Sequence, residues 1–265
     1  VVVGAFARIL HEEGYKNIVL ADSCGHGTTK QVIQGTGMDT YLEKYQIPAI
    51  DYTKGVRVEN PDGVQAKEFI LPKELLEAEG VISLSKMKTH ALERITGAVK
   101  NSYGFVYGKN KAIGHTKYPS ADSFARMLID LNQYVKPRLY IMDGITAMEG
   151  NGPGSGDPVA MNLILMSTDP VALDSVFARL VYLKPEMVPT NYHGEKMELG
   201  NCREENIEVV VVEENPSASA VCDEGSEITG RAKQCQNAKV SVDKKQIGID
   251  VVCNVISMEA LIEKY

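Results

Sequence analysis

Cysteine is scarce in this sequence, and its pattern argues against the folds that depend on it. The five cysteines among 265 residues are an odd number, and none of them forms a Cys-x-x-Cys pair. Without a visible signal peptide, a disulfide framework is not expected. No apolar run approaches the roughly 20 residues that a membrane helix needs. We therefore expect an intracellular, cytoplasmic protein without a membrane partner.

Basic residues are fewer than acidic ones, which argues against a general role in nucleic-acid binding. Lysine and arginine total 28, aspartate and glutamate total 35, and the net charge is −7. Nonspecific nucleic-acid binding depends on cations that neutralise phosphates, so no nucleic-acid partner is expected. Hydrophobic residues make up 44% of the chain, enough for a substantial core. The composition predicts one large domain, alone or with a small appendage.

Short apolar runs alternate with amphipathic stretches along most of the chain. Strands are predicted at residues 16–23, 47–53, 67–71, 80–85, 138–142, 161–166 and 207–212. Helices are predicted at residues 2–14, 28–45, 72–79, 91–105, 120–135 and 170–182. This alternation favours an α/β fold, with a mostly parallel sheet flanked by helices. The composition changes near residue 215, which predicts an α/β domain at 1–214 and a separate tail at 215–265.

The first candidate site is a basic stretch that directly follows a predicted strand. Between Lys86 and Lys117 there are seven bases and one acid, Glu93, so the segment carries +6 in a protein of −7. On an extended backbone, Lys86, Lys88 and His90 would share one face. Such a concentration of charge attracts anions such as phosphate or carboxylate, and histidine titrates near neutral pH. The alternative is a solvated basic edge that blunts sheet pairing.

The second candidate is an acidic, glycine-rich stretch at residues 143–158. Its five glycines indicate positive φ angles or a close approach of the backbone. It matches neither the Walker phosphate loop nor the dinucleotide fingerprint. Residues 143–174 include five acids and no base, and such a loop suits a hard cation such as magnesium, held by Glu149 and Asp157. The alternative is an Asx-rich surface turn.

Two segments of opposite charge, each at the end of a strand, together predict one polar pocket. In open α/β sheets, ligands lie beyond the carboxyl ends of the strands. The catalytic candidates are Lys86, Lys88, His90 and Asp143. The ligand-binding candidates are Lys100, Asn101, Gly150, Asn151 and Gly152. The expected occupant is a small anionic molecule, with or without a divalent cation.

Two further polar positions have simpler interpretations than chemistry. Cys24 and His26 could form a nucleophile pair, but a helix N-terminus near Thr28 with free backbone amides is the stronger interpretation. Asp169, directly before Pro170, is most simply the N-cap of a helix.

Three long stretches of this chain resemble one protein family. They are residues 86–104, 143–158 and 167–174. The family is catalogued as domain of unknown function 362, and the resemblance covers roughly residues 1–190. A typical member begins with a strand that carries a Lys-Pro-Asn motif, which is absent here. The first ten residues also have the pattern of a helix interior, so we expect the natural N-terminus to lie upstream.

The resemblance also implies a cofactor. Many members of that family carry a ferredoxin-like α+β tail with two [4Fe–4S] clusters, whose usual ligand motif is Cys-x2-Cys-x2-Cys-x3-Cys-Pro. Here the tail at 215–265 offers only Cys222, Cys235 and Cys253 as iron–sulfur ligands. Three cysteines cannot supply the four thiolates of even one cluster. The clusters are therefore implied by the resemblance and opposed by the residues present.

The leading hypothesis is an iron–sulfur-associated redox protein that binds a small anion in its α/β pocket. Its ferredoxin-like tail would pass electrons to that pocket from a redox partner protein. The first alternative is a non-redox, metal-assisted enzyme, such as a transferase or an isomerase. The second is a ligand-binding module without chemistry, and in both alternatives the tail is a structural relic.

Overall fold

The chain divides into two units in the computed structural model, which describes residues 1–23, 28–108, 110–211, 239–240 and 254–255. Unit 1 comprises Val1–Asp62, Lys67–Glu79 and Tyr103–Lys117. Unit 2 comprises Gly63–Ala66, Gly80–Ser102 and Tyr118–Tyr265. The predicted boundary at residue 215 stays a prediction, since nearly all of the tail lies outside the described residues. Within the described part of the chain, no helix combines the length and apolarity needed to cross a membrane.

Unit 1 is built from short helices and two-stranded sheets. Its helices are α1 (Val2–Glu12), α2 (Thr29–Thr36), α3 (Asp39–Lys44), α4 (Lys73–Glu77) and α6 (Asn110–Lys117). Its strands are β1 (Leu20–Ala21), β2 (Ala49–Ile50), β3 (Gly55–Glu59) and β4 (Glu68–Pro72). β1 pairs with β2 in parallel, and β3 pairs with β4 antiparallel. Buried Ala7, Ile33, Leu42 and Ile47 pack together as its core.

The predicted helix at 28–45 is two helices in the structure. It begins as predicted near Thr28, whose hydroxyl accepts a hydrogen bond from Gln31 N while the Gln31 side chain accepts one from Thr28 N. Gly37 ends α2 with a φ of 70°, a left-handed conformation that glycine adopts without strain. The chain then enters α3, so Gly37 marks a real break, whereas Gly35 lies inside α2.

Unit 2 contains the longer strands and the predicted site residues. Its strands are β5 (Ile82–His90), β6 (Arg94–Thr96), β7 (Leu139–Glu149), β8 (Asp157–Ser167), β9 (Ile207–Glu208), β10 (Val210–Val211), β11 (Lys239–Val240) and β12 (Asn254–Val255). Its helices are α5 (Ala98–Asn101), α7 (Ala121–Val135), α8 (Pro170–Leu180) and α9 (Pro189–Lys196). Short 3-10 turns cover Ser102–Phe105, Pro185–Met187 and Glu204–Asn206. β9 pairs with β11 antiparallel, and β10 pairs with β12 in parallel.

The main sheet of unit 2 is mixed, so the prediction of a mostly parallel sheet is wrong. Its strand order is β6-β5-β7-β8. Only β5 and β7 run in parallel; β6 is antiparallel to β5, and β8 is antiparallel to β7. The reason is that residues 91–93 and 150–156 are hairpin turns, which join antiparallel neighbours directly. The helix predicted at 91–105 is accordingly replaced by β6, α5 and a 3-10 turn.

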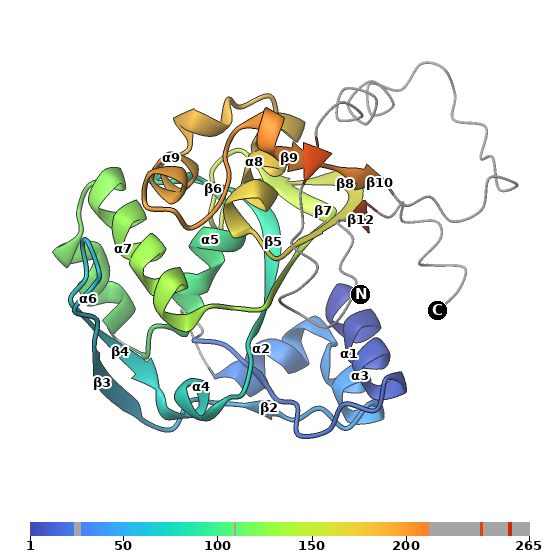
Figure 1. The fold of residues 1–265 in the computed structure, drawn as a ribbon. Coiled ribbons are helices and arrows are strands. Elements are labelled where there is room, and N and C mark those ends of the chain that lie inside the picture. Colours follow the sequence, from blue (N-terminus) through green and yellow to red (C-terminus); the bar gives the residue numbers. More distant parts are fainter. Residues whose placement is uncertain (24–27, 109, 212–238, 241–253, 256–265) are drawn as a thin grey trace, which may run out of the picture. The chain divides into compact units, whose positions relative to one another are not determined.

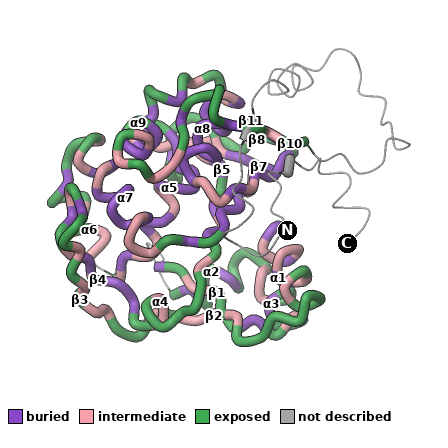
Figure 2. Tube along the Cα trace, viewed as in Figure 1, coloured by how far each residue is buried: buried purple, intermediate pink, exposed green. Residues whose placement is uncertain are grey.

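The core of unit 2 lies between its sheet and its helices. In Figure 1, α5 and α8 lie beside the strands of this sheet, and Figure 2 shows α8 and the inner parts of β7 and β8 as buried. The largest apolar cluster joins Met87, Ile95, Met142, Leu165 and Phe177 across these elements. Burying a side chain of this size contributes about 1.5–3 kcal/mol. This packing gives β5 one covered face, and the other face carries the candidate site.

α8 begins as the sequence predicts. The Asp169 carboxylate accepts hydrogen bonds from the backbone N–H groups of Val171 and Ala172, at 2.9 and 2.8 Å, and Pro170 occupies the first helical position. The N-cap interpretation of Asp169 is therefore confirmed. The same carboxylate accepts a hydrogen bond from Asn201 N at 2.8 Å, which ties the segment after α9 to the start of α8.

Candidate functional site

The first part of the basic stretch, residues 86–90, belongs to strand β5 itself. The prediction that these residues follow the strand is therefore wrong. β5 continues to His90, so Lys86, Lys88 and His90 are strand residues. Lys86 is exposed, and Lys88 and His90 are half-buried. The buried residues that alternate with them are Ser83, Ser85 and Met87. The strand period therefore places Lys86, Lys88 and His90 on the face opposite the core, and we call these three residues the basic face.

The two oppositely charged segments meet at Lys86 and Asp143. These residues are neighbours in the parallel pair of β5 and β7, and Lys86 Nζ donates to Asp143 Oδ2 at 2.7 Å. Asp143 Oδ1 accepts a hydrogen bond from Ile145 N, at an irregularity where the strand register shifts. The Lys86 side chain is 46% exposed, and such a pair stabilises a fold by about 1 kcal/mol at most. Its main effect is to orient Lys86 on the basic face.

His90 organises the turn between β5 and β6. Its Nδ1 atom accepts hydrogen bonds from the backbone N–H groups of Leu92 and Glu93, both at 3.1 Å. In the neutral ring, the proton must therefore lie on Nε2. Arg94, the residue after this turn, has a left-handed backbone conformation with a φ of 66°. His90 thus holds the backbone of Glu93 in place.

Glu93 is a residue whose importance could not be read from the sequence. Its side chain is fully buried, and neither carboxylate oxygen has a hydrogen-bond partner among the described residues. Burial raises the pKa of Glu93 to about 8, against the opposing attraction of Lys100 and with a smaller upward contribution from Asp122. The one visible hint was that Glu93 is the only acid in the basic segment.

Asp174 anchors the helix that carries Lys100. Its two carboxylate oxygens accept hydrogen bonds from the backbone N–H groups of Ala98 and Val99, at 2.5 and 3.0 Å. A Cβ atom at Gly97 would lie 2.0 Å from Asp174 Oδ1, so only glycine fits there. Burial raises the pKa of Asp174 to about 7, although both hydrogen bonds lower it. The Asp at the end of the 167–174 stretch therefore has a structural role toward α5.

Asn101 holds the other end of the same helix. Its side-chain amide donates to Leu84 O at 3.0 Å and to Ser83 Oγ at 3.2 Å. The ligand-binding role predicted for Asn101 stays a prediction, and these contacts show that its amide nitrogen bonds to β5. Lys100 is half-buried between the two anchor points. The structure thus fixes the backbone of Lys100 beside β5.

The glycine-rich loop is the hairpin between β7 and β8. Gly150 has a φ of 75°, and Asn151 O accepts a hydrogen bond from Ser155 N. Gly152 is packed directly on β5, since a Cβ atom there would lie 2.1 Å from Thr89 O. The loop therefore lies against the strand of the basic face, as the one-pocket hypothesis requires. Direct ligand contacts by Gly150, Asn151 and Gly152 stay predictions.

The two predicted cation ligands face each other at the base of this hairpin. Glu149 and Asp157 form the last cross-strand pair of β7 and β8, and both are exposed. Mg²⁺ commonly binds through one or two carboxylates and keeps several waters, so this pair fits such an ion. Within the described ranges, no three His, Cys, Asp or Glu side chains gather closely enough to hold a metal. The cation site stays a prediction with two ligands.

The iron–sulfur prediction falls on residues that the structure does not describe. Cys222, Cys235 and Cys253 all lie outside the described residues, as do Cys24 and His26. Three tail cysteines remain one thiolate short of a single cluster. The residues present do not fit the group, so no redox step is derived through it.

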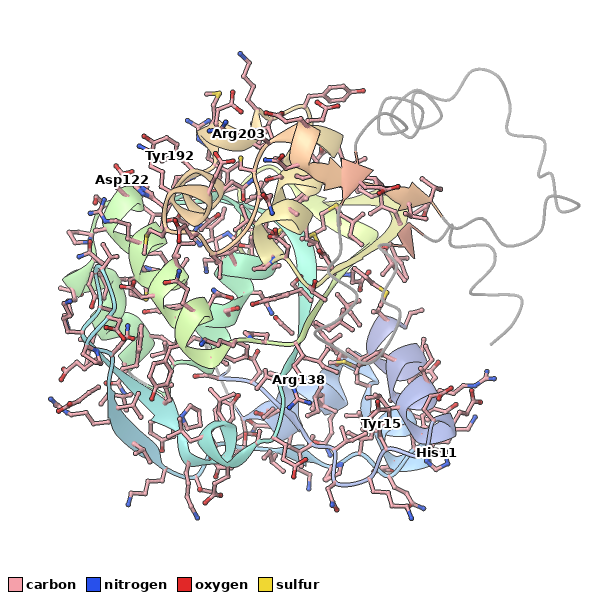
Figure 3. The ribbon with its side chains drawn as sticks, in the orientation of Figure 1. His11, Tyr15, Asp122, Arg138, Tyr192 and Arg203 are labelled. Atoms are coloured by element: carbon pink, nitrogen blue, oxygen red, sulfur yellow. The ribbon has the colours of Figure 1, made fainter. Side chains whose placement is uncertain are left out.

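His193 has a partner that the sequence pattern did not suggest. The pattern predicts a polar loop, but His193 lies in α9 and its Nε2 atom is 2.7 Å from Asp122 Oδ1. This hydrogen bond lowers the pKa of Asp122 below its usual value. Figure 3 shows Asp122 on α7 close to Tyr192, the neighbour of His193 on α9. The contact joins α7 to α9 through Asp122, the same carboxylate that contributes to the raised pKa of Glu93.

These features define an α/β protein with a basic strand face, an anchored lysine and a glycine-rich hairpin. Residues 1–179 match the family described as Domain of unknown function (DUF362), and the chain belongs to that family. The chain is also 36% identical over 199 residues to "Thylakoid-associated protein sll1697" from Synechocystis sp. (strain ATCC 27184 / PCC 6803 / Kazusa). That match covers 75% of this chain and 61% of the relative. The family resemblance is thus confirmed, and the family match ends before the tail.

Proposed function

We propose that this chain binds a small anion, of the phosphate or carboxylate class, on the basic face of β5. The observation that carries the proposal is the alternation along β5, which presents Lys86, Lys88 and His90 together on the face opposite the core. Anions concentrate at such clusters of positive charge, even in a protein whose net charge is negative.

The fixed position of the surrounding groups supports this proposal. Asp143 orients the Lys86 ammonium group, and the turn backbone holds the His90 ring, so both side chains are fixed by contacts within unit 2. Asp174 and Asn101 anchor both ends of α5, the short helix beside β5 that carries Lys100. Preorganised charges lose less conformational entropy on binding than mobile ones. The arrangement favours a ligand site over a solvated strand edge.

The remaining functional hypotheses stay predictions. Electron transfer from the tail would be tested by measuring iron and acid-labile sulfide in protein purified without oxygen. A cytoplasmic location and the absence of nucleic-acid partners are likewise untested. The name of the Synechocystis relative associates that protein with the thylakoid, which makes cell fractionation the direct test of location.

Replacing Lys88 by alanine is expected to weaken phosphate binding by about fivefold, the effect of losing roughly 1 kcal/mol of charge–charge attraction. Lys88 is a suitable position because it is half-buried and central in the basic face. Isothermal titration calorimetry with inorganic phosphate measures the affinity of both chains. The matched control is Lys184→Ala, since Lys184 is exposed and lies outside the basic face in the same unit. Equal losses in the two variants would contradict a localised site.

A further inference from the structure

Thr96, on strand β6, has a buried hydroxyl group for which the fold itself gives no role. The residue is 4% exposed, and its Oγ1 atom has no hydrogen-bond partner among the described residues. Buried polar atoms are nearly always hydrogen-bonded, so such a hydroxyl needs an explanation. We propose that Thr96 is a ligand-binding residue of the anion site, and that its hydroxyl donates a hydrogen bond to an oxygen of the anion held at Lys88. This inference rests on the proposed function, because it adds a neutral donor from a second strand to the same site.

The pairing of β5 with β6 places Thr96 on the same face as the cations. Thr96 is the direct antiparallel partner of Lys88, and Ile95 is the partner of Thr89. Residues directly opposite each other in an antiparallel pair point to the same face of the sheet, with their Cβ atoms roughly 5 Å apart. Ile95 belongs to the apolar cluster of the core, so the alternation along β6 independently directs Thr96 to the opposite face.

The spacing of these groups suits one oxyanion that is shared between the two strands. Lys88 and His90 lie two residues apart on β5, which is roughly 6.6 Å along the strand. Thr96 lies across from Lys88, and exposed Arg94 lies across from His90. Phosphate and carboxylate carry several acceptor oxygens, so one oxygen can face an ammonium group while another accepts from a hydroxyl. The site therefore extends over both strands of the hairpin.

Burial makes the Thr96 hydroxyl a stronger contact for an anion than an exposed hydroxyl. Thr96 is buried and Lys88 is half-buried, whereas Lys86 is exposed, so the Lys88–Thr96 pair lies in the less solvated part of the face. Hydrogen bonds to a charged group are stronger than neutral ones, and a low local dielectric strengthens them further. The alternative is that a buried water satisfies the hydroxyl, which predicts no effect of Thr96 on ligand affinity.

The test is to replace Thr96 by valine, which keeps the branched shape of the side chain and removes only the hydroxyl. Isothermal titration calorimetry with inorganic phosphate compares the variant with the wild-type chain. Thr96→Val is expected to bind phosphate about tenfold more weakly, because one hydrogen bond to a charged group is lost. Its midpoint of urea denaturation should stay the same or rise, since an unpartnered buried hydroxyl is removed. Thr96→Ser keeps the hydroxyl and should bind phosphate nearly as tightly as the wild-type chain.

The matched control is Thr190→Val. Thr190 is 1% exposed, its Oγ1 atom also lacks a partner among the described residues, and it lies in α9 of the same unit. The exchange therefore removes the same group from an equally buried position outside the basic face. The affinity of this variant for phosphate should equal that of the wild-type chain.

The outcomes distinguish the role of Thr96 from the anion site itself. Unchanged phosphate affinity in Thr96→Val, together with weakened binding in Lys88→Ala, would overturn the role of Thr96 and leave the anion site in place. Equal losses in Thr96→Ser and Thr96→Val would also overturn it, because the hydroxyl would then not be the binding group. A marked fall in the denaturation midpoint of Thr96→Val would contradict it as well, since the hydroxyl would then already have a structural partner. Absence of phosphate binding to the wild-type chain would overturn both proposals.

Discussion

Replacing Glu93 by glutamine is expected to stabilise the folded chain at alkaline pH and to change its stability little at acidic pH. The pKa of Glu93 is raised in the folded chain, from 4.5 to about 8. A raised pKa means that the folded state holds the proton more tightly than the unfolded state does. Its contribution to stability is therefore complete below about pH 4.5, and it is lost as the pH rises through about 8.

The size of this effect follows from the same linkage. The wild-type chain should lose stability relative to Glu93→Gln by about 1.4 kcal/mol per pH unit in that window, up to a limit of about 5 kcal/mol. Urea denaturation at a series of pH values measures the free energy of unfolding of both chains. Glu205→Gln, at an exposed position, should track the wild-type curve. A constant offset between the wild-type chain and Glu93→Gln at all pH values would contradict a raised pKa for Glu93 in the folded chain.

Replacing Asp174 by alanine is expected to cost about 3 kcal/mol of stability, because it leaves two buried backbone N–H groups without acceptors. Those groups belong to Ala98 and Val99, both of which are 0% exposed. Asp174→Asn should cost less, since its amide oxygen can still accept one of the two hydrogen bonds. The free energy of unfolding by urea or guanidinium is the measurement.

The control for this prediction is Asp62→Ala, which removes an exposed carboxylate and should change stability by less than about 0.5 kcal/mol. Equal stabilities of Asp174→Ala and the wild-type chain would mean that α5 is held by other contacts. The position of Lys100 could then no longer be attributed to Asp174.

Local patterns predicted the mixture of helices and strands and several element boundaries, but not the mixed direction of the main sheet. The apolar run at 138–142 lies in β7, the one at 161–166 lies in β8, and Asp169 caps α8 as expected. Strand direction could not be predicted in the same way. The glycine-rich stretch at 143–158 contains enough polar residues to indicate a loop, yet most of it extends β7 and starts β8. Cross-strand pairing decides this, and one sequence does not show pairing partners.

The features of the site that depend on charge could be predicted from the sequence. The features that depend on burial could not. Opposite charges at Lys86 and Asp143 suggested that their segments meet, and the structure pairs them. Glu93 and Asp174 look like ordinary surface acids in the sequence. Their surroundings are set by long-range packing of the β5–β6 hairpin and α8, which also shifts their pKa values. Sequence position alone could not distinguish them from exposed acids.

The most direct test of the central claim is to map where inorganic phosphate binds on the intact wild-type chain. A titration followed by backbone amide chemical shifts reports each residue separately. The account predicts saturable shifts that are largest at residues 86–90 and 97–101, the basic face and the anchored helix beside it. Shifts that are absent there, or that are equally large around exposed Lys184, would contradict the proposed anion site.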